Sequence, residues 1–321
     1  MSIWGGIGNE EGPLGSLALS RSTVDRATER RSDTAWVEKA WADPGTRVLV
    51  VNKGKALART ADGEIELLLV PSGQAPEGTR FLLGVDDDGA AYFGVSGALP
   101  EIPGADATGR SADVRAVDLR QVGAALSDRD AGLFTHAVAL ANWHDSHTHC
   151  PQCGTPTVPA PAGHLTMCPK DATEHFPRLD PAVIMLVTDS EDRCLLARNA
   201  SWGERRMSVL AGFVEPGESI EHAVAREVHE ETAIVCGDIQ YLGSQPWPMP
   251  RSLMLGFRAT AAGGQTLTVD GEEIAEAHWF TRPELRAALE RGELSIAPTS
   301  SIARRLIEYW YGGKIPDFPR A

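Results

Sequence analysis

The stretch GFVEPGESIEHAVAREVHEETAI, residues 212–234, constrains the fold of this 321-residue chain more than any other. Pro216 and Gly217 predict a turn, and Ser219 is suited to cap a helix that begins directly after it. Apolar residues that recur every four positions predict one buried stripe on this helix: Ile220, Val224 and Val228.

Three glutamates lie close together on the same predicted helix: Glu227, Glu230 and Glu231. Like charges at this spacing repel one another and weaken a helix, so we expect something to offset them. Hard divalent cations such as Mg²⁺ bind carboxylate oxygens, and bound cations would remove the repulsion. A solvated acidic helix face, which is common in globular proteins, is the alternative interpretation.

The spacing of the whole stretch resembles the Nudix box, G-x5-E-x7-R-E-U-x-E-E-x-G-U, in which U is an apolar residue. The matching residues are Gly212, Glu218, Arg226, Glu227, Val228, Glu230, Glu231 and Ile234. Ala233 stands where the family has glycine, at the position that ends the helix. The resemblance implies a hydrolase that cleaves a nucleoside diphosphate linked to another group, with Mg²⁺ or Mn²⁺ as its cofactor.

The same resemblance implies the metal ligands. Glu227 and Glu231 would bind the metal directly, with Glu230 in or near the same set, and these three are the candidate catalytic residues. Glu273, in the segment GEEIAEAHW, aligns with an additional metal ligand of the family. Two nearby carboxylates are alternatives to it: Glu272 and Glu276.

Two further charged residues of the box would act on its glutamates rather than on the substrate. The resemblance implies that Glu218 supports the loop or a metal-bound water, and that Arg226 orients the glutamates through an ion pair. Several glutamates compete for the role of general base, and hydroxide bound to the metal would also serve. The sequence therefore predicts a set of candidate bases and does not single out one.

A second motif, SQPWPMPRS, lies at residues 244–252. Its three prolines forbid a regular helix and disfavour a central strand, so we predict a rigid loop that holds Trp247. The segment resembles the SQPWPFPxS signature of the NADH pyrophosphatase branch of the Nudix family, and Met249 replaces the usual phenylalanine with another apolar filler. The matching residues are Ser244, Gln245, Pro246, Trp247, Pro248, Pro250 and Ser252. A structural proline loop around a core tryptophan is the alternative.

This second resemblance implies hydrolysis of the pyrophosphate bond of NAD(H) to nicotinamide mononucleotide and AMP, and removal of NAD caps from RNA 5′ ends. Two other functions stay open. One is a Nudix hydrolase that prefers ADP-ribose or a dinucleoside polyphosphate, and the other is a non-catalytic nucleotide-sensing module. The intact glutamates argue against a sensor. NADH, NAD⁺ and NAD-capped RNA share the ADP half, so the sequence does not rank them.

The resemblance also implies the residues that bind the substrate. Phe176 and Phe213 would stack on a base, from different subunits of a homodimer, because aromatic stacking holds any base. Gln245 and Trp247 would line the same pocket, and the backbone of Ala303 would contact the nucleotide. For either phenylalanine alone, packing in the core is the alternative.

A cysteine-rich segment precedes the Nudix box. Cys150 and Cys153 form a C-x-x-C motif, and Cys168 is a third cysteine. The family carries a four-cysteine zinc ribbon here, but Asp171 occupies the fourth position. Structural zinc needs four ligands, so Asp171 binds through oxygen, a histidine replaces it, or zinc is lost. The candidate histidines are His175, His164 and His149.

The pattern of the whole chain predicts an α+β protein with three parts. Residues 1–147 form an N-terminal α+β domain with a flexible start through about residue 30 and a helix over 117–147. Residues 148–178 form a zinc-ribbon-like segment. Residues 179–321 form a Nudix domain, an α/β/α sandwich with a mixed sheet. Apolar residues make up 42% of the chain and charged residues 23%, which is ordinary for a globular protein.

Charge and cysteine content limit the partners. The net charge of −14 disfavours general binding to nucleic acid or anionic membrane. No apolar run approaches the roughly 20 residues that span a bilayer, and we recognise no secretory signal. Five cysteines are an odd number and argue against a disulfide framework. We therefore expect a cytoplasmic protein without a membrane partner.

Overall fold

A computed structural model describes residues 12–61, 63–101, 114–269 and 271–317, apart from the side chain of Ala61. The described chain forms two compact units, which we treat separately. The first unit contains residues 19–179 and 246–251, and the second contains residues 12–18, 180–245 and 252–317. Of the helices in these described ranges, none has the length and apolar content to span a membrane.

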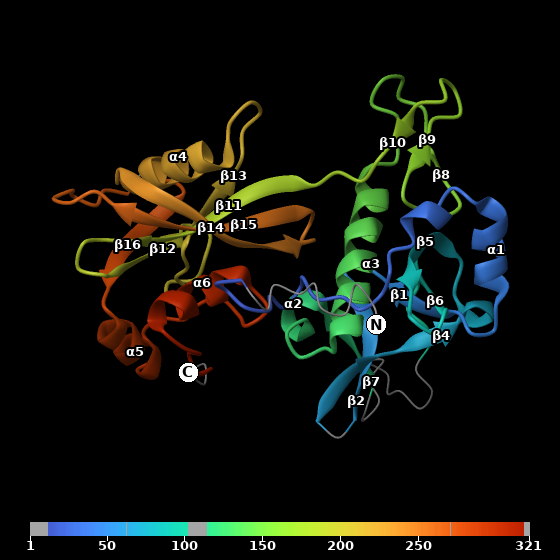
Figure 1. Cartoon of the computed structure of the whole chain (residues 1–321), viewed down its shortest axis with the longest axis horizontal. Coiled ribbons are helices and arrows are strands. Elements are labelled where there is room, and N and C mark those ends of the chain that lie inside the picture. Colours follow the sequence, from blue (N-terminus) through green and yellow to red (C-terminus); the bar gives the residue numbers. More distant parts are fainter. Residues whose placement is uncertain (1–11, 62, 102–113, 270, 318–321) are drawn as a thin grey trace. The chain divides into compact units, whose positions relative to one another are not determined.

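The second unit is built on one mixed sheet (Figure 1). Its strand order is β14-β15-β11-β12-β16, and β13 also pairs with β11. The long strand β11 runs parallel to β15 and antiparallel to β12 and β13. The bounds are β11 (Asp180–Thr188), β12 (Cys194–Asn199), β13 (Leu210–Phe213), α4 (Ile220–Thr232), β14 (Cys236–Trp247), β15 (Ser252–Ala261), β16 (Ile274–Phe280), α5 (Arg282–Glu290) and α6 (Ile302–Tyr311).

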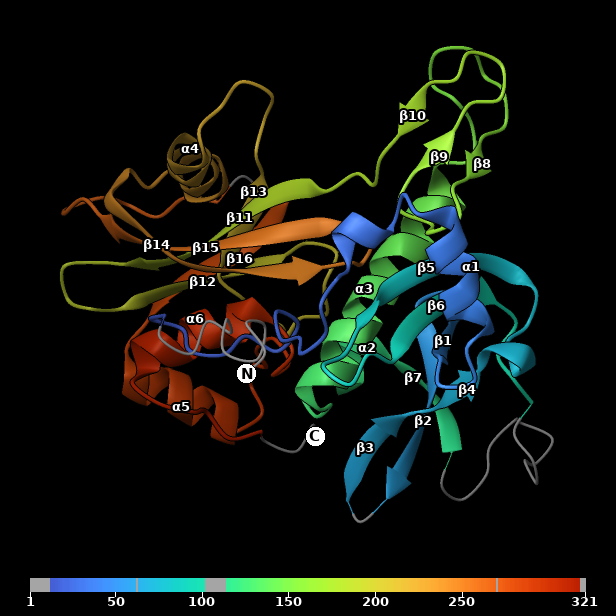
Figure 2. The ribbon, with the colours of Figure 1, turned by 45° about the vertical axis from the view of Figure 1, so that its right-hand side comes forward.

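Helices cover both faces of this sheet. Successive side chains of a strand point to opposite faces, so β11 supplies two hydrophobic clusters. Val183, Met185 and Val187 pack in the cluster that includes residues of α4. Ile184 and Leu186 pack in the cluster that includes residues of α5 and α6. Figure 2 shows α4 on one side of the sheet and α5 and α6 on the other. The predicted α/β/α sandwich with a mixed sheet is confirmed.

The first unit contains a four-stranded sheet of order β4-β1-β6-β5 and a three-stranded sheet of order β3-β2-β7. Asp87, Asp88 and Gly89 lie in the turn between the antiparallel strands β5 and β6. The bounds are α1 (Thr34–Ala42), β1 (Arg47–Val51), β2 (Lys55–Ala61), β3 (Glu64–Leu67), β4 (Leu69–Pro71), β5 (Gly78–Val85), β6 (Ala91–Gly97), β7 (Val114–Asp118), α2 (Leu119–Val122) and α3 (Asp128–Ser146), with short 3-10 helices η2 (Thr28–Arg30) and η3 (Ser72–Gln74).

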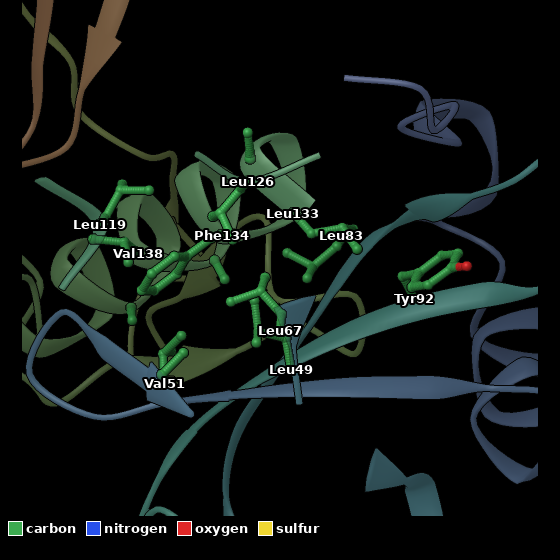
Figure 3. Packing of buried hydrophobic residues seen from close by; sticks show 14 of the residues in the cluster. Leu49, Val51, Leu67, Leu83, Tyr92, Leu119, Leu126, Leu133, Phe134 and Val138 are labelled. Atoms are coloured by element: carbon green, nitrogen blue, oxygen red, sulfur yellow. The ribbon is translucent and has the colours of Figure 1, made fainter. Parts of the chain in front are cut away.

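The core of the first unit lies between α3 and the sheet. Leu49 and Val51 of β1 share a buried cluster with Leu133, Phe134 and Val138 of α3 (Figure 3). The alternate residues of β1 join a second cluster, which contains residues of α1. Beyond α3, three short strands pair in the order β10-β9-β8 and form the ribbon segment. Their bounds are β8 (Val158–Pro159), β9 (Thr166–Met167) and β10 (Glu174–His175).

The prediction of one helix over 117–147 is wrong in its first part. The structure has the end of β7, the short helix α2 and then α3, which begins at Asp128. The Asp118 side chain accepts a hydrogen bond from Arg120 N, and Ser127 accepts one from Asp130 N. Two N-caps therefore divide the apolar pattern into two helices, because each cap fixes a new helix start.

The flexible start expected through about residue 30 stays a prediction, but several of its described residues are packed in the two units. Residues 1–11 lie outside the described residues, but Leu19 and Val24 are buried in the first unit. Leu14 and Leu17 are buried in the second unit, where Arg305 Nη2 donates to Leu14 O at 2.8 Å. The predicted domain boundaries at 147 and 178 stay a prediction, with 12–18 and 246–251 as segments that group differently in the compact units.

We expect Ala233→Gly to stabilise the protein. Ala233 ends α4 in the left-handed conformation, with φ of 58°. That conformation costs an L-residue roughly 1–2 kcal/mol, and the freedom of glycine in the unfolded chain offsets part of the gain. The net increase in unfolding free energy should be about 0.5–1 kcal/mol, visible in the thermal midpoint. Ala225→Gly, inside α4, is the control and should lower stability by about 1 kcal/mol.

Candidate active site and cysteine cluster

Arg226 organises the acidic residues at the start and middle of α4. Its Nε and Nη2 donate to the two carboxylate oxygens of Glu218, at 2.8 and 2.9 Å. Its Nη1 donates to Glu227 Oε1 and to Glu230 Oε2, both at 2.9 Å. Its Nη2 also donates to Phe213 O at 2.9 Å. The predicted ion pair between Arg226 and the glutamates is therefore confirmed.

The sequence also predicts the local fold that positions this arginine. The Ser219 side chain accepts from His222 N and caps α4, as expected. Glu218 Oε2 accepts a hydrogen bond from Glu215 N at 3.1 Å, which ties the loop before the helix to the arginine. The hydrogen bonds from Arg226 lower the pKa of Glu218, and the charged partners raise the pKa of Arg226, first of all Glu218.

The three predicted catalytic glutamates differ sharply in exposure. Glu231 is only 4% exposed, because it continues the buried stripe of Val224 and Val228 by a further helical turn. The Glu227 side chain is 13% exposed, and the Glu230 side chain is 58% exposed. A solvated acidic face therefore does not describe Glu227 or Glu231. Burial of a carboxylate is costly, so these two positions call for a compensating charge.

Gly212 makes room for Glu227. A Cβ atom placed on Gly212 would lie well under 3.0 Å from the carboxylate carbon and both carboxylate oxygens of Glu227. Gly212 lies in β13, whose register with β11 pairs it with Val183. The glycine at the start of the motif thus allows the glutamate to pack directly against the strand.

The electrostatics of Glu227 link it to the predicted fourth carboxylate. Burial raises the pKa of Glu227 most, hydrogen bonds from Arg226 lower it, and the charges of Glu230 and Glu273 raise it further. Glu276, one alternative to Glu273, instead pairs with Arg198 at 2.6 Å. Both Glu272 and Glu273 are exposed. The charges that act on Glu227 therefore favour Glu273 as the additional carboxylate. We use the name carboxylate group for Glu218, Glu227, Glu230, Glu231 and Glu273.

The carboxylate group is suited to hard cations. Its donors are oxygens, and the single guanidinium of Arg226 faces three carboxylates within 4.0 Å. The remaining negative charge, together with the buried Glu231, is what a divalent cation such as Mg²⁺ would neutralise. The donor chemistry and the charge balance therefore fit the cofactor that the sequence implies.

The two aromatic residues predicted to hold a base are both exposed. Phe213, at the end of β13, is 59% exposed, and its carbonyl accepts from Arg226. Phe176 follows β10 in the first unit and is 63% exposed. Neither ring packs in a core, which was the alternative for each. Both rings are therefore accessible, as stacking on a base requires.

The other predicted binding residues are largely engaged within the protein. Gln245 has 0% exposure, and its Nε2 donates to Ser300 O at 3.0 Å. The amide of Ala303 donates to Ser301 Oγ at the start of α6. In the first unit, Trp247 and Met249 pack against the main core cluster. Trp247 also lies 5.7 Å from the Arg120 guanidinium, measured from its ring centroid.

The proline motif itself forms an edge strand up to Trp247. The sequence predicts a rigid loop over the whole segment. Instead, β14, which is an edge strand of its sheet, continues to Trp247. Edge strands tolerate proline, because one of their sides makes no ladder hydrogen bonds. Asn142 of α3 then fixes the following prolines: its Nδ2 donates to Pro248 O at 2.7 Å and to Pro250 O at 3.2 Å.

The ribbon segment brings four candidate metal ligands together. Ligand atoms of Cys150, Cys153, Cys168 and Asp171 all lie within 4.8 Å of one another. Cys150 Sγ is 3.7 Å from Asp171 Oδ2, and Cys153 Sγ is 3.5 Å from Cys168 Sγ. Ligand atoms around a tetrahedral zinc, with bonds of about 2.3 Å, lie about 3.8 Å apart. The cluster therefore fits a structural zinc ion.

Hydrogen bonds and burial shift the pKa values of three groups in this cluster. Burial raises the pKa of Cys168 to about 11, whereas hydrogen bonds from Thr155 lower the pKa of Cys153. The Cys168 thiol and the Thr173 amide hold the pKa of Asp171 well below its usual range. The histidines considered as alternative ligands lie outside this set. His164 Nε2 lies 2.7 Å from Leu82 O, and His149 Nδ1 lies 2.8 Å from Thr148 Oγ1.

Three family models match successive parts of the chain. The NADH pyrophosphatase-like rudimentary NUDIX domain matches residues 45–143. The NADH pyrophosphatase zinc ribbon domain matches residues 145–176, and the NUDIX domain matches residues 178–299. Together they span most of the chain between residues 45 and 299, whereas α1 and α6 lie outside the matches.

Relatives match over most of the chain. The NAD-capped RNA hydrolase NudC of Mycobacterium bovis (strain BCG / Pasteur 1173P2) is 44% identical over 307 residues, which are 91% of this chain and 94% of that protein. The protein of the same name from Mycobacterium tuberculosis (strain ATCC 25618 / H37Rv) is 43% identical over the same shares. The NAD-capped RNA hydrolase NUDT12 of Macaca fascicularis is 39% identical over 197 residues, 58% of this chain and 42% of that protein. The resemblance found in the two sequence motifs is thereby confirmed, and the chain belongs to the NADH pyrophosphatase branch of the Nudix hydrolases.

Proposed function

We propose that this hydrolase cleaves the pyrophosphate bond of NAD(H), giving nicotinamide mononucleotide and AMP, and removes NAD caps from RNA 5′ ends. The observation that carries the proposal is the set of carboxylates on α4 and in the loop before it, in which Arg226 holds Glu218, Glu227 and Glu230. The names of the mycobacterial relatives, matched over nearly the whole chain, support NAD-capped RNA as one substrate.

In this proposal Glu227, Glu230, Glu231 and Glu273 hold Mg²⁺ or Mn²⁺, and the first three are the catalytic residues. The bound cation would polarise the diphosphate oxygens and stabilise the charge that develops on them. Arg226 keeps the glutamates in position, and Gly212 admits the carboxylate of Glu227. Hydrolysis adds one water across a P–O bond of the P–O–P bridge, so the bridging oxygen leaves with one phosphate, the oxygen of water joins the other, and each product is a phosphate monoester.

We further propose that Phe213 and Phe176 stack on the base or the nicotinamide, and that the protein works as a homodimer. Their exposed rings support the first part, because a free aromatic face is what stacking requires. Gln245, Trp247 and the backbone of Ala303 stay candidates for the nucleotide pocket. Gln245 is buried and donates to the Ser300 carbonyl, which supports a role for Gln245 in positioning that carbonyl.

Zinc in the ribbon is proposed to have Asp171 as its fourth ligand, beside Cys150, Cys153 and Cys168. The reduced thiols of this cluster agree with a cytoplasmic location, which stays our prediction. The three-part division at residues 147 and 178 is proposed for the domains, and the zinc ribbon and NUDIX matches, 145–176 and 178–299, support it.

The fourth zinc ligand leads to a test by metal release. Asp171→Cys should slow zinc transfer to a chromogenic chelator by roughly 10- to 100-fold, because a fourth thiolate is a softer ligand than a carboxylate. Asp171→Ala should speed the transfer by a similar factor. If Asp171→Ala retains zinc as tightly as the unaltered protein, a histidine such as His175 supplies the fourth ligand and our assignment is wrong.

Product analysis tests the proposed reaction. Purified protein is incubated with NADH and Mg²⁺ or Mn²⁺, beside a chelator control, and the nucleotides are separated by chromatography. We expect equal amounts of AMP and reduced nicotinamide mononucleotide that appear only with the metal. Cleavage of ADP-ribose or a dinucleoside polyphosphate, without cleavage of NADH, would contradict the proposed substrate. No cleavage of any of these would support a nucleotide-sensing module.

A further inference from the structure

A group of basic side chains lies in the first unit and shares no residue with the carboxylates of α4. It contains Arg26 and Arg31 on either side of η2, His136 of α3 and His164 of the loop before β9. The His136 and His164 rings lie 5.2 Å apart, measured between centroids. Arg31 Nη2 donates to Arg26 O at 3.0 Å, which joins the two arginines. Arg26 and Arg31 also act on both rings through their charge, so these four cationic or potentially cationic groups lie near one another in this unit.

The two arginines of this group lack a bound carboxylate. Within the described ranges, no acidic side chain lies within ion-pair distance of Arg26 or Arg31. Arg31 Nε is buried and has no hydrogen-bond partner there. An unsatisfied buried donor of a charged group is costly, so native structures rarely leave one. This donor is therefore the first sign that an anion binds at this place.

The nearby carboxylates are already engaged elsewhere. Asp25 and Glu29 act on Arg31 through their charge, but only at a distance. Asp25 Oδ1 accepts from Ala27 N at 2.9 Å, and Glu29 lies 3.7 Å from Arg30. Burial and the charge of Arg26 lower the pKa of Arg31, whereas the charges of Glu29 and Asp25 raise it. Neither carboxylate is therefore bound directly to Arg26 or Arg31 within the described residues.

Arg26 is both reachable and partly desolvated. Its side chain is exposed to solvent, yet burial among the surrounding protein lowers its pKa, with no carboxylate to offset the effect. A guanidinium in that setting binds an anion more strongly than one in bulk water, because the local dielectric is lower. Its planar fork of donors also matches the oxygens of a phosphate.

We propose that Arg26 and Arg31 form a binding site for a phosphate monoester dianion, such as the phosphate of a mononucleotide, with His136 and His164 beside it. Two guanidinium charges match the two negative charges of such a group. No glutamate of the carboxylate group takes part, so this site does not depend on the proposed hydrolysis. If that hydrolysis occurs, AMP and nicotinamide mononucleotide are themselves phosphate monoesters and would be natural ligands.

The two histidines supply a local report of binding. His136 Nδ1 lies 3.3 Å from Leu83 O, and His164 Nε2 lies 2.7 Å from Leu82 O, so one nitrogen of each ring is committed to a carbonyl. Burial and the two arginine charges lower the pKa of both rings, that of His164 to about 4. A phosphate between the arginines and the rings would oppose that effect and change the magnetic environment of both rings.

The experiment is a titration of the full zinc-loaded chain, without Mg²⁺ or Mn²⁺, followed by NMR of its nine labelled histidines. Inorganic phosphate is the first probe and AMP is the second. We expect saturable shifts of the His136 and His164 ring signals with both probes. If neither ring signal moves at saturating phosphate and AMP, the proposal is wrong, whatever the variants do.

Matched variants test the arginines. Arg26→Gln and Arg31→Gln should each weaken phosphate binding about tenfold or more, because each removes a charge-assisted donor. Arg26→Lys keeps the charge and should retain more affinity than Arg26→Gln. Arg30→Gln alters an exposed neighbour that pairs with Glu29 and should leave binding within about twofold. Equal weakening by Arg30→Gln and Arg26→Gln would overturn the assignment to this site.

A last comparison separates the monoester from nucleic acid. A short single-stranded RNA with a 5′-hydroxyl carries only phosphodiesters, each with one charge. We expect it to shift the two ring signals less than AMP does at equal concentration. Tighter binding of this RNA than of AMP would show that the site recognises the RNA backbone, and would overturn the proposal for a monoester.

Discussion

Glu231→Gln is expected to lower the turnover number with NADH and Mg²⁺ by about 100-fold or more, the scale seen when one preorganised charge-stabilising group is lost. The substitution keeps the shape of the side chain and removes its charge. Glu231 is 4% exposed and lies on the buried stripe of α4. A neutral amide is less costly to bury than a carboxylate, so the thermal midpoint should not fall by much.

Glu221→Gln is the matched control, because Glu221 lies in the first turn of the same helix and is exposed. It should leave the turnover number within about twofold, as expected for an exposed surface charge. Titration with Mg²⁺ or Mn²⁺ separates the two roles of Glu231. If Glu231 binds the metal, Glu231→Gln should raise the metal concentration needed for half-maximal rate. Near-normal turnover of Glu231→Gln would contradict the metal assignment.

The predictability of the site varies with the range of its interactions. The position of Ser219 and the stripe of Val224 and Val228 predict α4 and its cap, because both depend on residues within a few positions. The ion pair of Arg226 with Glu230 follows from the i,i+4 spacing of a helix, whereas the pair with the adjacent Glu227 does not. These local contacts could be predicted well.

Contacts between segments that are distant in the sequence could not be predicted in this way. The packing of Gly212 against Glu227 depends on how β13 pairs with β11, which the local pattern does not contain. The burial of Gln245 likewise depends on the Ser300 carbonyl, which is far away in sequence. The basic group around Arg26 has no motif, since its members come from three separate segments. A single sequence carries no signal for contacts of this kind.

The N-terminal part shows the same limit at the level of a domain. Its strands and α3 are visible in the sequence, but the match to a rudimentary NUDIX domain at residues 45–143 was not foreseen. The Nudix box is identified by its spaced glutamates, and the longest helix of the matched region, α3, has no glutamate in its sequence DRDAGLFTHAVALANWHDS. Without the charged spacing, only the apolar pattern is left, and many folds share it.

Gly212→Ala is expected to lower turnover by about 100-fold or more through its effect on Glu227. The added methyl would collide with the whole Glu227 carboxylate, so either the glutamate or β13 must move. Inserting a methyl group into such a packed position typically costs about 1–3 kcal/mol of stability. Gly203→Ala is the control, since a Cβ at Gly203 meets no atom within 4 Å and should change neither quantity.

A double variant separates the collision from the chemistry. Combining Gly212→Ala with Glu227→Ala removes the carboxylate with which the added methyl collides. Stability should then recover relative to Gly212→Ala alone, with an interaction energy of about 1–3 kcal/mol in the double-mutant cycle. Activity should stay low, because the ligand is gone. Purely additive stability losses would show that Gly212 is not required for the sake of Glu227, and the family's glycine would then need a different explanation.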